Sequence, residues 1–193
     1  MSLKVFDSKD HIAEWLSEEV LNRFIPSKYT SDGDAGFSLE NYIHGQLVGN
    51  RNLIDLPTYD GGGSELKTFL SDTNGDTIHI ARCGHKTFDQ HKEYASNKMK
   101  SCFLPMMTSD ILHTTHTTFL YPDEPPMPRQ ELGYRCHEIM WLEDLDYDKF
   151  REVINVRRCE NNTKIASTIN LWKLKDCYEN AMYLTDYSEK KYA

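Results

Sequence analysis

The sequence predicts an α/β (α+β) domain in which helices flank a mixed central sheet. Three observations support this prediction. An amphipathic helix pattern opens the chain, short strands separated by turn residues follow it, and helix and strand patterns then alternate. The length of 193 residues fits one domain, and aromatic residues along the whole length argue against a disordered chain. We therefore expect residues 1–193 to form a single folded unit.

Two helices are expected near the start of the chain. Ser8 or Asp10 can cap the first helix, whose apolar residues recur at three- and four-residue spacing until Pro26 stops it. After a polar stretch, Ser38 opens a second helix that carries Glu40 in its first turn. Each helix has one apolar side, so both should pack against a core.

The segment 52–82 is expected to form a hairpin that carries the chemistry of the protein. A short extended run ends at Asp60, three consecutive glycines follow, and residues 64–70 form a strand. An Asn-Gly pair then predicts a turn into a second strand, 76–82, which should pair with residues 65–70.

The rest of the chain alternates between helix and strand patterns, with a proline-rich loop in the middle. The expected elements are a helix over 88–101 capped by Thr87, strands over 111–121 and 135–142, a helix over 147–157, a strand over 164–174 and a last helix over 176–184.

Composition restricts the class of protein. The chain contains no run of about 20 apolar residues, as a membrane span requires, and its start lacks a signal-peptide pattern, so we expect a cytoplasmic protein without a membrane partner. The five cysteines are too widely spaced for a zinc knuckle or a disulfide framework. A formal net charge of −8 argues against a nucleic-acid partner unless one surface is locally basic.

Glu65 and Lys67 are the strongest candidates for chemistry. Alternate residues of a strand share one face, so these two side chains should project together while Leu66 points into the core. A compact glycine turn can bring Asp60 to Glu65, and two adjacent carboxylates call for a cation such as Mg²⁺. A water on that cation could attack a phosphodiester, with Lys67 orienting the water and stabilising the transition state.

These residues resemble the motif of the PD-(D/E)xK nuclease superfamily, and within it the MutH-like and MvaI/BcnI-like restriction enzymes. The resemblance covers roughly residues 36–82: a helix with Glu40, then Asp60, then Ser-Glu65-Leu-Lys67-Thr. It implies a restriction-endonuclease-like fold, an Mg²⁺ cofactor and double-stranded DNA as substrate. It also implies catalytic roles for Asp60, Glu65 and Lys67, with Glu40 as the acidic residue on the helix.

The first acidic residue has two candidates. Pro57 is separated from Asp60 by two residues, whereas the family motif has the proline directly before the acid. Nine residues separate Asp55 from the Glu65-Leu-Lys67 stretch, a spacing that other restriction enzymes also show. We therefore expect Asp60 and Glu65 to hold the metal, with Asp55 as the alternative to Asp60.

Residues outside the motif are candidates for DNA contact, chiefly within a recognition part over about 109–175. His113 and His116 lie three apart in a β-branched strand, so they should point to opposite faces and offer hydrogen bonds separately. Basic and polar residues of the helix over 88–101 and of the segment after the proline-rich loop could bind phosphates or bases. The candidates are His113, His116, Lys98, Lys100, Arg135 and His137.

The sequence thus predicts an Mg²⁺-dependent DNA endonuclease of the type II restriction kind, or a nicking enzyme. One alternative is a catalytically silent nuclease-like fold that binds DNA or protein, which the acidic net charge would suit. Another is a histidine-based phosphoesterase that acts on small nucleotides through His113 or His116.

Overall fold

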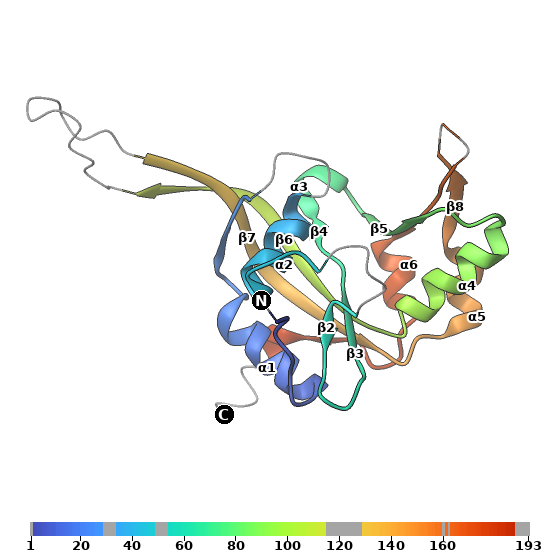
Figure 1. Cartoon of the computed structure of the whole chain (residues 1–193), viewed down its shortest axis with the longest axis horizontal. Helices are drawn as coiled ribbons and strands as arrows, with labels where there is room; N and C mark the ends of the chain where they lie inside the picture. Colours follow the sequence, from blue (N-terminus) through green and yellow to red (C-terminus); the bar gives the residue numbers. More distant parts are fainter. Residues whose placement is uncertain are drawn as a thin grey trace, which may run out of the picture.

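A long antiparallel pair of strands organises the molecule. The computed structural model describes residues 2–28, 34–48, 54–114, 129–159, 161 and 163–187, and the side chains of 112–114 and 129–130 lie outside this description. Strand β6 (Ser101–Thr114) pairs with β7 (Arg129–Glu143) along its whole length, and the end of the pair at Thr114 and Arg129 projects from the body (Figure 1).

The larger sheet has the order β1-β7-β6-β3-β2, with β4 also on β6 and β10 on β7. Because β3 and β4 run parallel to β6 while the other pairs are antiparallel, the sheet is mixed, and the predicted α/β fold class is confirmed. The short strands are β1 (Phe24–Pro26), β2 (Leu56–Pro57), β3 (Gly63–Leu66), β4 (Phe69–Leu70) and β10 (Met182–Tyr183).

Helices and a second sheet cover the larger sheet. The small lobe, as we call the part seen on the right of Figure 1, consists of a three-stranded sheet in the order β5-β9-β8 with helices α4 and α5. The bounds are α1 (Lys9–Glu19), α2 (Asp34–His44), α3 (Ser71–Asn74), β5 (Thr77–Cys83), α4 (Phe88–Lys98), α5 (Tyr147–Val153), β8 (Asn155–Arg158), β9 (Ile165–Asn170) and α6 (Leu171–Asp176).

Alternate side chains of β6 enter two different hydrophobic cores. Phe103 packs with residues of α1 and α2, whereas Cys102 and Leu104 pack with residues of α4, α5 and the small sheet. Leu66 on β3 belongs to the first core. Because side chains alternate along a strand, Glu65 points to the opposite face, towards α4.

The predicted hairpin between residues 65–70 and 76–82 is wrong. Strand β3 is paired on both edges, antiparallel to β2 and parallel to β6, so it has no free edge for the strand that follows. The expected Asn-Gly turn forms the short helix α3 instead, and β5 leaves the larger sheet to pair with β9.

Several element ends also differ from the sequence prediction. The first helix is capped by Ser8 as predicted but ends at Glu19, before the short strand β1. The second begins at Asp34 rather than Ser38, and within it the Asp34 carboxylate accepts a hydrogen bond from the Ser38 hydroxyl. Strand β9 ends at Asn170, which caps α6, and a short strand, β10, occupies part of the last predicted helix.

Residue 63 must be a glycine because β2 approaches it closely. Its φ is +136°, and a Cβ at this position would lie 2.3 Å from the Leu56 carbonyl oxygen. Any side chain there would force β2 away from β3. Since β2 follows directly on Asp55, this close approach determines where that carboxylate lies.

We expect Gly63→Ala to lower the free energy of unfolding by about 1–3 kcal/mol, because the new methyl group meets backbone in a strained conformation. Urea unfolding followed by circular dichroism measures the change. Gly84→Ala is the control, because a Cβ there has its nearest neighbour at 3.6 Å. Equal stability of the two variants would contradict the proposed role of Gly63.

Candidate active site

The β2–β3 register brings Asp55 to Glu65. Leu56 pairs with Ser64 and Pro57 with Gly63, so one further step along the antiparallel pair places Asp55 opposite Glu65. The Leu66 N–H donates a hydrogen bond of 2.9 Å to Asp55 Oδ2, which fixes that carboxylate against β3.

Lys67 lies between the two carboxylates. Its Nζ is 3.4 Å from Glu65 Oε2 and 3.9 Å from Asp55 Oδ2. The three side chains are only 8%, 12% and 16% exposed for Glu65, Asp55 and Lys67, respectively. Buried charges are costly unless they are paired, so the ammonium is required to keep both acids in this position.

A second ammonium reaches Glu65 from the small lobe. Lys98, the last residue of α4, places its Nζ 3.2 Å from Glu65 Oε2. The same Nζ lies 5.6 Å from the centre of the Tyr94 ring, one helical turn earlier. Lys98 was predicted to contact DNA, and in the structure it contacts Glu65, which its place in the sequence did not indicate.

The surroundings of Glu65 perturb its ionisation. Burial raises the pKa of Glu65 to about 7, and the negative charge of Asp55 and a hydrogen bond between the two carboxyl groups act in the same direction. Lys67 and Lys98 oppose the shift. A carboxyl group that titrates near neutrality beside specific charged partners is typical of functional sites.

His44 on α2 holds the backbone of Asp55. Its Nε2 lies 2.8 Å from the Asp55 carbonyl oxygen, and the Lys4 N–H donates to its Nδ1 at 3.2 Å. Because Nδ1 accepts a hydrogen bond, we assign the proton of the neutral ring to Nε2, which then donates to Asp55. Burial lowers the pKa of His44, and the charge of Lys4 adds to this effect.

Asp60 does not join the site. It lies in the exposed turn beyond β2, where its Oδ1 accepts hydrogen bonds from the Thr58 hydroxyl (2.5 Å) and the Gly62 N–H (2.9 Å). These hydrogen bonds lower the pKa of Asp60. The expectation that the glycine turn would bring Asp60 to Glu65 is therefore wrong, and Asp55 is the acid that the fold brings there.

Glu40 also has a structural contact of its own. Its Oε2 accepts a hydrogen bond of 3.1 Å from the Val48 N–H, which ties down the chain after α2. The helix does pass beside the site, as predicted, but the residue of α2 that reaches Asp55 is His44, one turn after Glu40. Helical periodicity, which places residues four apart on one side, could have identified His44.

Arg135 and His137 lie on β7, away from the site. Arg135 binds Asp110 (Nε to Oδ2, 2.8 Å), and His137 Nε2 is 2.6 Å from the Thr108 hydroxyl. Arg135 pairs with Thr108, six residues along β6 from the residue that pairs with Glu65, so it is roughly 20 Å away.

The other predicted DNA contacts are not brought to the site by any described interaction. Lys100 is exposed in the turn after α4. His113 lies on β6 opposite Gln130, with its side chain outside the described part, and His116 lies outside the described residues. The histidine-based phosphoesterase hypothesis therefore stays a prediction.

The donor set fits a hard divalent cation. Within the described residues, no three His, Cys, Asp or Glu side chains form a metal-binding group. Mg²⁺, however, is commonly held by only one or two carboxylates and keeps several waters. Asp55 and Glu65 supply two such carboxylates, and burial, followed by the charge of Asp55, raises the pKa of Glu65 to about 7.

No protein-family model, curated protein or solved structure matches this chain. In the part of the chain that the structure describes, no helix has the length and apolar character needed to cross a membrane.

We expect His44→Ala to lower the free energy of unfolding by about 1–3 kcal/mol at neutral pH, because the Asp55 carbonyl and the Lys4 N–H lose a buried partner. The lowered pKa of His44 means that the folded state favours the neutral ring. The advantage of the wild type should thus be complete above pH 6.5, the ordinary pKa, and shrink as pH falls from there.

Urea unfolding of both proteins at several pH values tests this expectation. His44→Gln, whose amide can still donate to Asp55, is the matched variant and should be less destabilised than His44→Ala. A difference in stability that grows on acidification would contradict the assigned neutral ring.

Proposed function

We propose that this protein is an Mg²⁺-dependent nuclease that hydrolyses phosphodiester bonds in DNA, with Asp55, Glu65 and Lys67 at its centre. The observation that carries the proposal is the buried pair of carboxylates bridged by one ammonium. With Asp55 as the first acid, the order Asp55, Glu65, Lys67 also resembles the PD-(D/E)xK motif.

Asp55 and Glu65 are the residues that would hold the cation. When bound, Mg²⁺ would neutralise charge on the phosphate and supply an activated water. The protein contributes two carboxyl groups as oxygen ligands, and the hydrogen bonds from Leu66 and His44 keep Asp55 in place. The large hydrophobic cores on both sides of β3 and β6 hold the strand that carries Glu65.

Lys67 is suited to stabilise the transition state. An ammonium has three N–H donors, so Lys67 can keep its two carboxylate contacts and still donate a hydrogen bond to a phosphate oxygen. Charge that develops on that oxygen would strengthen the bond, which is how a positioned donor lowers a barrier. Lys98 adds positive charge on the side of Glu65 that faces α4.

Variants at the two candidate acids test this assignment directly. We expect Asp55→Asn to abolish Mg²⁺-dependent cutting of plasmid DNA, because the amide keeps the hydrogen bond from Leu66 but loses the charge. Lys67→Ala should lower the rate on the order of 100-fold. Asp60→Asn is the matched control and should keep wild-type activity, since its carboxylate makes only turn contacts.

Two results would overturn this proposal. Cutting that persists in EDTA and in Lys67→Ala would place the activity elsewhere. Equal loss in Asp60→Asn and Asp55→Asn would reject Asp55 as the specific partner of Glu65. If the wild type binds DNA without cutting it, the protein is a binding module instead.

The pH dependence of cutting gives a further prediction. Glu65 must be ionised to hold a cation, and its pKa of about 7 means that the rate should rise between about pH 6 and about pH 8. Because the cation favours the ionised carboxylate, more Mg²⁺ should move the midpoint to lower pH. Initial rates at several Mg²⁺ concentrations measure this, and a midpoint independent of Mg²⁺ would contradict it.

A further inference from the structure

The three-stranded sheet of the small lobe has one buried face and one exposed face. Ile78 and Ile80 on β5 and Ile165 and Ile169 on β9 are buried. All of these except Ile165 belong to the core that α4 and α5 share. Val156 on β8 packs on the same side. The residues between them therefore point outward.

The strand register groups the outward residues in rows. Arg82 pairs with Ala166, and Ala166 pairs on its other edge with Arg157. Both arginines are exposed. Neighbouring strands lie about 4.8 Å apart, so the two arginine backbones flank the small Ala166 side chain at a separation of about 10 Å.

A bulge in β5 adds a histidine to the same face. The register shifts between His79 and Ala81, where Ile80 and Ala81 both turn inward. His79 and Arg82, three residues apart, therefore share the outward face, which a regular strand would not allow. His79 pairs with Thr168, which lies beside Asn155, so polar side chains continue the row.

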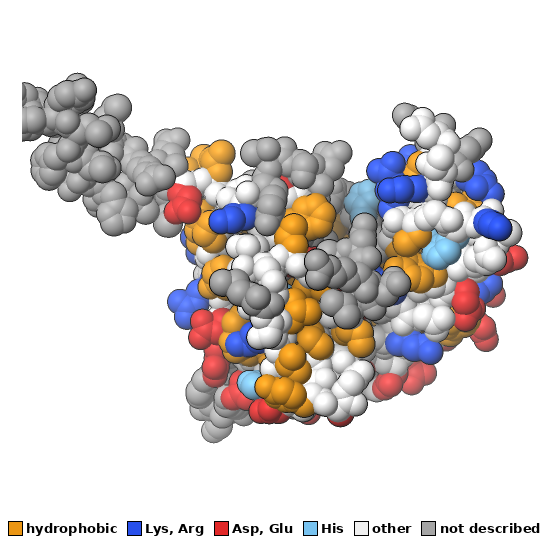
Figure 2. Space-filling view, in the orientation of Figure 1, with side chains coloured by type: hydrophobic (Ala, Val, Ile, Leu, Met, Phe, Trp, Pro, Cys, Tyr) orange, Lys and Arg blue, Asp and Glu red, His pale blue; other side chains and the backbone are white. Residues whose placement is uncertain are grey.

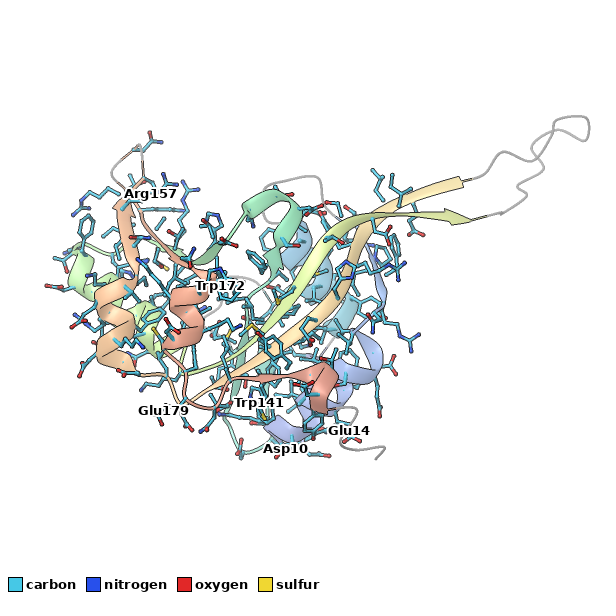
Figure 3. All side chains as sticks on the ribbon, turned by 180° about the vertical axis from the view of Figure 1, so that it is seen from behind. Asp10, Glu14, Trp141, Arg157, Trp172 and Glu179 are labelled. Atoms are coloured by element: carbon cyan, nitrogen blue, oxygen red, sulfur yellow. The ribbon has the colours of Figure 1, made fainter. Side chains whose placement is uncertain are left out.

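The charge of this face differs from that of the chain as a whole. The protein has 30 acidic residues against 22 Lys and Arg, yet none of the residues in the three strands is acidic. Among the described residues, neither Arg82 nor Arg157 forms an ion pair, whereas Arg135 and Arg151 do. Figure 2 shows Lys and Arg side chains gathered at the top of the small lobe, and Figure 3 shows Arg157 near its tip.

We propose that this outward face of β5, β9 and β8 binds the phosphate backbone of DNA. Two unpaired guanidinium groups across a small residue can each donate to phosphate oxygens, and Thr168 and Asn155 offer further hydrogen bonds. The occupant is a polyanion because the described residues of the face combine cations with neutral polar groups, and the three strands contain no Asp or Glu. The inference rests on the proposed nuclease function, since it assigns a substrate-holding surface to it.

The surface is linked to the candidate site through α4. That helix packs against the buried side of the same sheet, and its last residue, Lys98, contacts Glu65. The small lobe that carries the proposed face is therefore connected to the catalytic residues by one helix. The arginines would position DNA without taking part in the reaction.

Binding of a fluorescently labelled DNA duplex in EDTA, where metal-dependent cutting is prevented, tests the proposal. We expect the double variant Arg82→Gln with Arg157→Gln to weaken binding by about tenfold or more, and the plot of log affinity against log salt to lose about two units of slope. Arg158→Gln is the matched control, because this neighbour lies over the Phe88 ring on the other face and donates to the Lys86 carbonyl.

The two proposals fail separately in this design. If the double variant binds DNA as tightly as the wild type, or if Arg158→Gln weakens binding equally, the surface is rejected while Mg²⁺-dependent cutting can still support the nuclease. If the wild type binds through the two arginines but never cuts, the surface stands and the nuclease is rejected. Failure of the wild type to bind DNA overturns the surface.

Discussion

The contact of the Lys67 ammonium with two buried carboxylates is the constraint around which the structure is arranged. Lys67 Nζ lies 3.4 Å from Glu65 Oε2 and 3.9 Å from Asp55 Oδ2, and its positive charge lowers the cost of ionising either acid in a site so little exposed to water. Different parts of the fold position these groups. The β2 register and the hydrogen bond from His44 position Asp55, and side-chain alternation along β3 and the residue after it positions Glu65 and Lys67. The end of α4 positions Lys98.

Strand alternation alone was sufficient to place Glu65 and Lys67 together with Leu66 in the core, and the mixed sheet followed from the succession of element types. Strand alternation did not predict which acidic residue, Asp55 or Asp60, lies beside Glu65. Choosing Asp55 over Asp60 requires the length of the turn, and that length depends on how closely β2 can approach Gly63. Local sequence patterns do not contain this tertiary distance.

The contributions of His44 and Lys98 were harder to foresee for a related reason. His44 contacts Asp55 and Lys98 contacts Glu65, each from a helix that reaches the site only after the chain has folded. Helical periodicity places His44 on the same side as Glu40, but no spacing along the sequence connects Lys98 to Glu65. The pairing of β5 with β9 was missed because the turn signal before β5 carries no information about which strand edge is already occupied. Local sequence patterns predicted the helices and strands well, but they predicted poorly which elements pair or pack together.

Strand β3, held on both edges, has a consequence for how the site can change. The register between β3 and β6 can shift only by whole residues. A shift of one residue would turn Glu65 into the apolar core beneath α1 and α2 and would expose Leu66 to the charged site. The geometry of the site is therefore all-or-none with respect to folding. The β3 backbone cannot shift by a fraction of a residue. Sequence variation around β3 must therefore either preserve the register or lose the site entirely.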